Sequence, residues 1–163
     1  MSFLRRGEKR TAASEYTRIL VPVIGDDAVD GPALKIAAML LGSREGGEAS
    51  LLNVIEVPFD RNLDTEDEGA VADADGILTR AEAALEERGV KVRTSTVQAR
   101  VAGPAIVDEA NEVEADLILM GLRYKKRFGG QWDAGRTVPY VMRNSTAPVW
   151  CLRAETKELA HTP

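Results

Sequence analysis

The stretch GLRYKKRFGGQWDAGRTV, residues 121–138, holds the residues of this sequence best suited to chemistry. It places three cations, Lys125–Arg127, next to the glycine pair Gly129–Gly130. Cationic side chains beside flexible backbone N–H donors can bind an anion such as phosphate. The alternative interpretation is a solvated loop whose charges offset a net charge of −5.

Two arginines and a tyrosine in the same stretch extend the anion hypothesis. Arg123 and Arg136 are predicted to contact a phosphate group, because guanidinium groups match phosphate oxygens in geometry and charge. Tyr124 is able to stack on an adenine ring, and it is equally able to hold the loop in place without a ligand. Trp132 is predicted to pack against the loop rather than against a ligand.

The bulk composition excludes several classes of function. A length of 163 residues suits one domain, and the net charge of −5 gives no overall attraction to nucleic acid or to membranes. The single cysteine, Cys151, excludes an intrachain disulfide and a cysteine-based zinc site, and the single histidine, His161, lies in a polar tail. No metal site is expected. The apolar runs are far shorter than the ~20 residues of a membrane span, so the cytosol is the expected location.

Short apolar runs alternate with helical patterns along the chain. Strands are predicted at 18–23, 49–57, 90–99, 116–120 and 147–153. Helices are predicted between them, the first with Asp30 as N-cap and the second after a long acidic loop at 58–75. Strands joined through helices predict a doubly wound α/β domain at 16–153, with a five-stranded parallel sheet, helices on both faces, and flexible ends at 1–15 and 154–163.

Such sheets bind ligands beyond the carboxyl ends of the strands, where the strand order reverses. In the order 3-2-1-4-5 the reversal lies between the first and fourth strands. Their exit segments are IGDDAVDG, residues 24–31, and GLRYKKRFGGQWDAGR, residues 121–136. The segment with anion-binding chemistry is therefore one of the two that the fold selects.

The segments RILVPVIGDD, LLNVIEVP, AGPAIVDEANEVEADLILMG and GRTVPYVMRNSTAPVWCLR together resemble the universal stress protein family. The resemblance spans residues 16–153. It implies the strand order 3-2-1-4-5, a homodimer joined through the last strand, and in many members an ATP site at the switch point. The sequence YKKRFGG…GRTVPYV also resembles the stress-protein domains appended to amino-acid permeases.

The ATP-binding members of the family carry Gly-x2-Gly-x9-Gly-(Ser/Thr) after the fourth strand. Gly121 matches the first position, Tyr124 replaces the second glycine, Gly135 matches the third after one extra residue, and Arg136 replaces the hydroxyl residue. Ile24 follows the first strand where an acidic residue is usual, so an ATP site of the usual geometry is not expected. The predicted binding residues for ATP, another adenine nucleotide or another phosphorylated ligand are Pro22, Val23, Ile24, Val54, Met120, Gly121, Arg123, Tyr124, Gly129, Gly130, Gly135, Arg136, Thr137 and Val138.

The last strand suggests a partner. Val149 and Cys151 alternate with Trp150 and Leu152, which leaves apolar side chains on both faces of a terminal strand. Such an edge is expected to be covered, and a second copy of the chain would cover it. Cys151 is predicted to be a buried strand residue rather than a nucleophile.

Three functions compete. The first is a non-catalytic homodimeric domain that senses an adenine nucleotide or another phosphorylated ligand. The second is a regulatory domain of a membrane transporter of the amino-acid permease type that does not bind ATP. The third, a slow nucleotide hydrolase, ranks last because Asp26, Asp27 and Asp133 are its only candidate bases and no Gly-Lys-(Ser/Thr) motif is present.

Overall fold

The computed structural model describes residues 16–42, 44–123, 125–126, 132–133 and 135–153. The strands are β1 (Arg18–Pro22), β2 (Glu48–Glu56), β3 (Lys91–Ala99), β4 (Leu117–Gly121), β5 (Lys125–Lys126), β6 (Trp132–Asp133) and β7 (Val149–Leu152). The helices are α1 (Asp27–Leu41), α2 (Glu68–Glu86), α3 (Ala102–Glu112) and α4 (Thr137–Asn144).

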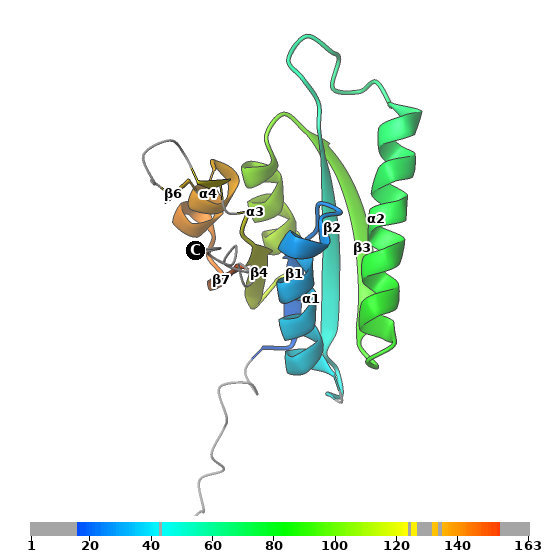
Figure 1. Cartoon of the computed structure of the whole chain (residues 1–163), viewed down its shortest axis with the longest axis vertical. Coiled ribbons are helices and arrows are strands. Elements are labelled where there is room, and N and C mark those ends of the chain that lie inside the picture. Colours follow the sequence, from blue (N-terminus) through cyan, green and yellow to red (C-terminus); the bar gives the residue numbers. More distant parts are fainter. Residues whose placement is uncertain (1–15, 43, 124, 127–131, 134, 154–163) are drawn as a thin grey trace, which may run out of the picture.

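Five of the strands form one parallel sheet in the order β3-β2-β1-β4-β7. Helix α1 packs mainly on β1 and β4, and α2 packs on β2 and β3. Helices α3 and α4 pack against each other on the opposite face, and Figure 1 shows α2 and α3 on opposite sides of β2 and β3. The predicted doubly wound fold and its strand order are confirmed.

The strands form because their apolar residues supply two cores at once. In β1, Ile19 and Val21 enter the core beneath α1 and α2, whereas Leu20 enters the core beneath α3 and α4. In β4, Leu119 enters the core beneath α1 and α2, and Ile118 enters the core beneath α3 and α4. All of these side chains are at most 1% exposed. A strand buried on both faces reads as a continuous apolar run, which explains the pattern in the sequence.

The helices cover the sheet with apolar residues at helical spacing. In α2, Ala74, Leu78, Ala81 and Leu85 are buried at intervals of three or four residues, as a core-facing stripe requires. Among the described residues, no helix combines the length and the apolar character that crossing a membrane would need.

Two predicted helix starts are wrong. Helix α1 begins at Asp27, because the Asp26 carboxylate caps it by accepting the Ala28 N–H at 3.0 Å, so Asp30 lies inside the helix rather than at its N-cap. Helix α2 begins within the predicted acidic loop, because Asp67 accepts the N–H groups of residues 69 and 70, each at 3.1 Å. A short antiparallel hairpin, β5-β6, was also not predicted and lies within the segment that follows β4.

Candidate functional site

The exit segments of β1 and β4 meet above the carboxyl edge of the sheet, as the switch-point argument predicted. A guanidinium nitrogen of Arg123, after β4, lies 3.0 Å from the Asp26 carboxylate, after β1. Gly121, at the end of β4, lies directly against the backbone of Val29 in α1. The two segments are therefore neighbours in space although almost a hundred positions separate them.

A cavity of about 570 Å³ opens at this point, bounded by the ends of β1, β2 and β4 and the first turns of α3 and α4. Every predicted site residue that the structure describes lines it. These residues are Pro22, Val23, Ile24, Val54, Met120, Gly121, Arg123, Gly135, Arg136, Thr137 and Val138. The remaining predicted residues, Tyr124, Gly129 and Gly130, lie outside the described residues, and so do the side chains of residues 125–127.

One part of the cavity is apolar. Leu52, Ile106, Met120 and Val138 are buried around it, and Val54 is half-buried beside them. These side chains belong to the core beneath α3 and α4, so the same residues serve the fold and the wall of the cavity. Such a surface suits a flat or apolar group of a ligand.

The opposite part of the cavity favours an anion. Helix α4 begins here, and its N-cap residue Arg136 forms no side-chain capping bond. Uncapped N–H groups and the positive end of the helix dipole attract negative charge. Arg136 and Arg123 add two guanidinium groups, and both side chains are largely exposed. The Arg123 side chain is 53% exposed and its ion pair engages one nitrogen, so its other donors face solvent.

Asp30, which the sequence analysis placed only as a cap, proves central to the wall of the cavity. Its side chain is buried, with 6% exposure, and accepts the Ile24 N–H at 3.0 and 3.1 Å and the Gly25 N–H at 2.7 Å. Burial raises the pKa of this carboxyl above its ordinary value, and the backbone hydrogen bonds oppose that rise in pKa. Asp30 therefore fixes the loop that follows β1.

Glu56 is a second residue that sequence reasoning missed. One of its carboxylate oxygens accepts the Ala102 N–H at 2.8 Å and thereby caps α3, whose own N-cap residue Val101 contributes no side-chain bond. A carboxylate at the end of a neighbouring strand caps this helix, so the pairing spans 46 positions of sequence. No local pattern could have revealed it, because capping motifs are searched within a few residues.

The two matched motif glycines have different structural reasons. A Cβ at Gly121 would lie 2.0 Å from the backbone oxygen of Val29, so only glycine allows β4 to end against α1. Gly135 has space around it but a φ of +69°, a left-handed conformation that favours glycine.

Cys151 is half-buried in β7, and burial raises the pKa of its thiol. A raised pKa lowers the thiolate fraction at neutral pH, which agrees with its interpretation as a strand residue. Within the described part of the chain, no three His, Cys, Asp or Glu residues gather closely enough to hold a metal ion.

The sequence of residues 15–153 matches the family model described as the universal stress protein family. The chain belongs to the universal stress protein family. Comparison with curated proteins gave no match.

Solved universal stress protein structures share the fold. A universal stress protein from Archaeoglobus fulgidus is 24% identical, with a TM-score of 0.68 over 83% of this chain and 98% of that one. The Archaeoglobus fulgidus protein in complex with dAMP is 23% identical, with a TM-score of 0.65 over 83% and 97%. A family member from Arabidopsis thaliana with AMP bound is 15% identical, with a TM-score of 0.66 over 87% and 94%.

Proposed function

We propose that this universal stress protein domain binds an adenine nucleotide, or another phosphorylated ligand of similar shape, in the cavity between the ends of β1 and β4. The observation that carries the proposal is the division of one cavity into two parts. One part is apolar, and the other presents the N-terminus of α4, whose N-cap residue forms no side-chain bond, with Arg123 and Arg136. A nucleotide has the matching division into a flat base and a charged phosphate.

The similar structures support the adenine part of this proposal. The Archaeoglobus fulgidus protein was solved with dAMP and the Arabidopsis thaliana protein with AMP. The departures from the family motif in this chain concern the phosphate side of the cavity. The proposed phosphate contacts therefore come from the arginines and from α4, rather than from a hydroxyl residue at position 136.

The proposed function is binding without catalysis. Two carboxylates, Asp30 and Glu56, line the cavity among the described residues. Both Asp30 oxygens and one Glu56 oxygen already accept backbone N–H groups, so these oxygens are engaged in the fold rather than directed at a water molecule. Measurement of phosphate release from ATP by the wild-type protein tests this part, and turnover that is lost in Glu56→Gln would contradict it.

Titration calorimetry with ATP, ADP, AMP and adenosine tests the binding. We expect Arg136→Glu to weaken ATP binding at least about tenfold, since a hydrogen bond to a charged group contributes about 1.5–3 kcal/mol. Adenosine binding should change little. The matched control is Arg143→Glu, the same charge reversal on an exposed arginine in the last turn of α4. Equal loss in both variants would refute the phosphate contact.

The control also separates binding from folding. A glutamate at the N-terminus of α4 is favoured by the helix dipole, and one in the last turn is disfavoured, each by about 0.3–1 kcal/mol. Arg136→Glu should therefore bind ATP less well without unfolding more easily, and Arg143→Glu should do the opposite.

We also propose that the domain forms a homodimer through β7, which is an edge strand of the sheet. Trp150 is 38% exposed there, and Val149, Cys151 and Leu152 are half-buried. Sedimentation velocity should show a dimer that Trp150→Lys converts to a monomer. Phe59→Lys, at an aromatic residue that is 82% exposed in the segment between β2 and α2, should leave the dimer intact.

A transporter-regulatory domain that does not bind ATP is the alternative function. Two observations favour it: Ile24, where the family has an acid, is 51% exposed at the cavity, and Asp26 already pairs with Arg123. Absence of heat with every nucleotide, together with an unchanged fold, would favour this alternative over nucleotide sensing.

A further inference from the structure

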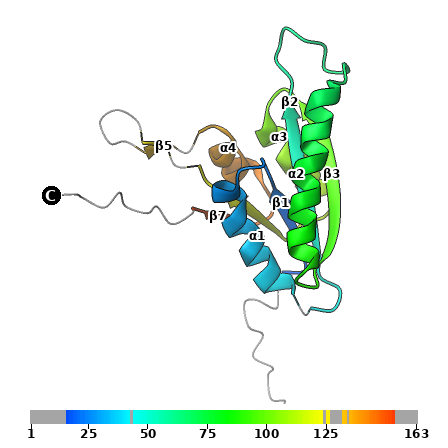
Figure 2. The same ribbon diagram turned by 45° about the vertical axis from the view of Figure 1, so that its right-hand side comes forward.

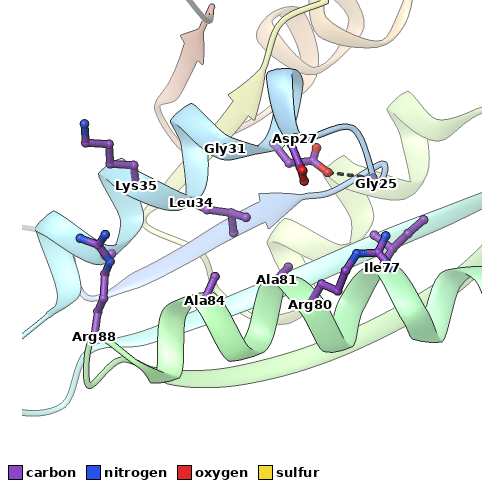
Figure 3. Close-up of a pocket in the computed structure, with 12 residues that line it drawn as sticks. Gly25, Asp27, Gly31, Leu34, Lys35, Ile77, Arg80, Ala81, Ala84 and Arg88 are labelled. Carbon is purple, nitrogen blue, oxygen red and sulfur yellow. Dashed lines mark hydrogen bonds between the residues drawn. The ribbon is translucent and has the colours of Figure 1, made fainter.

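A second cavity, of about 310 Å³, lies between α1 and α2, outside the proposed nucleotide site (Figure 3). Figure 2 shows these two helices side by side. They run in the same direction, because both connect parallel strands. Asp30 lines both cavities, but its carboxylate is engaged by the loop after β1. The cavity between the helices therefore has its own lining to offer a ligand.

The floor of this cavity is apolar. Leu34 of α1 faces Ala81 and Ala84 of α2 across it (Figure 3), and Ala38 and Ile77 also line it. Alanines at three of these positions leave the space that longer side chains would fill, which explains why two packed helices enclose a hollow here. Ala84 is exposed, so the floor is open to solvent on one side.

The rim of the cavity is cationic. Lys35, Arg80 and Arg88 line it and are exposed, and none of them forms an ion pair with another residue that the structure describes. Figure 3 shows Lys35 and Arg88 toward one end and Arg80 beside Ile77 toward the other. Arg80 lies within α2, and Arg88 lies in the turn just after the end of α2. Of the described residues, Asp27 and Asp30 are the carboxylates in the lining.

Among the described residues, this cavity combines an apolar floor with three cations that form no ion pair. The arrangement complements a molecule with an apolar body and an anionic end. The body would lie on the alanines and Leu34, and the anion would pair with a guanidinium group of Arg80 or Arg88. A cavity of this size lies at the lower end of the range of about 300–1,000 Å³ for small-molecule sites.

We propose that the cavity between α1 and α2 is a second ligand site, which binds a small amphipathic organic anion: an aliphatic carboxylate or phosphate ester. The site is distinct from the nucleotide cavity and does not depend on nucleotide binding.

Octanoate and octyl phosphate, kept below their critical micelle concentrations, are the probes. In two-dimensional NMR titrations of the full chain, we expect saturable shifts of the amides of residues 77–88 and 34–38. Hexanoate should bind about fifteenfold more weakly than octanoate, since each buried methylene contributes about 0.8 kcal/mol. Binding that does not depend on chain length, or shifts confined to the nucleotide cavity, would overturn the proposal.

Two matched pairs of variants locate the site. Ala84→Trp fills the cavity and should abolish octanoate binding, whereas Ala83→Trp, at an exposed alanine one position away that does not line the cavity, should not. Arg80→Glu should weaken binding by up to about fivefold, as expected for the loss of at most about 1 kcal/mol from an exposed ion pair. Thr79→Glu, at the neighbouring exposed position, should leave binding unchanged. Equal effects within either pair would refute the site.

A further arm distinguishes a free ligand from a membrane surface. Vesicles of phosphatidylcholine with one quarter phosphatidylserine present the same anionic and apolar chemistry in a bilayer. A cavity between two packed helices should bind the free octyl compounds and should not retain the protein on the vesicles. Vesicle binding lost in Arg80→Glu, without binding of free octanoate, would replace this proposal with a membrane contact.

Discussion

Asp30→Ala is the most informative single change, because one buried carboxylate holds the loop that borders both cavities. Its two oxygens accept the N–H groups of Ile24 and Gly25, at distances of 2.7 to 3.1 Å. Removal of the carboxylate leaves both donors without their partner. The loop is also where the chain turns from β1 into α1, with Gly25 at a φ of +84°.

The magnitude follows from the donors that lose a partner. Ile24 is 51% exposed, so water can partly replace the carboxylate, and about 1 kcal/mol for each N–H group is appropriate. Alanine removes the cost of burying a carboxylate and has a higher helix propensity than aspartate. These two effects offset a few tenths of a kcal/mol of the loss. We expect a net loss of about 2 kcal/mol, which for a chain of this size corresponds to a fall in Tm of about 4–8 °C.

Thermal and urea unfolding measure this loss, and hydrogen exchange of the Ile24 and Gly25 amides locates it. Asp27→Ala is the control, because Asp27 is an exposed carboxylate in the same first turn and contributes to stability through the helix dipole, by about 0.3–1 kcal/mol. If the two variants lose equal stability and the two amides exchange as in the wild type, Asp30 does not hold the loop.

Three further predictions concern single residues. The pKa of the Asp30 carboxyl, measured by carbon-13 NMR, should lie above the ordinary value of 3.8. Between these two pKa values the folded protein retains a proton that the unfolded chain has lost. The wild type should therefore lose stability relative to Asp30→Asn as pH rises from 3.8 through the folded pKa. Gly121→Ala should cost about 3 kcal/mol in urea unfolding, since its Cβ would lie 2.0 Å from the Val29 oxygen and the core resists overpacking; a change below 1 kcal/mol would contradict this close approach. Gly135→Ala should cost about 1 kcal/mol through backbone strain alone, so a neutral result would contradict the left-handed φ.

The fold was predictable because its signals are local and repeated. A strand that helices cover on both faces is a continuous apolar run in the sequence. The alternation of such runs with helices limits the topology to a parallel sheet. The errors arose at helix starts. Asp30 has the right residue type for an N-cap, yet Asp26 does the capping, since several aspartates in one turn offer the same local signal. The Asp67 cap was missed because the acidic segment around it shows no apolar periodicity.

The candidate site was predictable only in outline. Sequence identified the two exit segments, and the described residues of both do line one cavity. It could not reveal that Asp26 pairs with Arg123 or that Glu56 caps α3, because these pairs join segments 97 and 46 positions apart. It also could not reveal the cavity between α1 and α2. In the sequence, cations on an exposed helix face are interpreted as solvated side chains, because the position of the second helix is known only from the structure.

The two motif glycines show why sequence matches alone are poor evidence for a phosphate site here. Gly121 is required by the Val29 oxygen and Gly135 by its own φ, so both would be glycines in a domain that never met a nucleotide. The case for an anion must therefore come from features that the fold does not need. Arg136 is such a feature, since its side chain forms no capping bond and its charge at the helix N-terminus is unfavourable to the helix dipole. Under the proposed function, a ligand that brings negative charge would compensate the Arg136 cation, and this is why the reversal of Arg136 tests the proposed function more directly than the loss of either glycine.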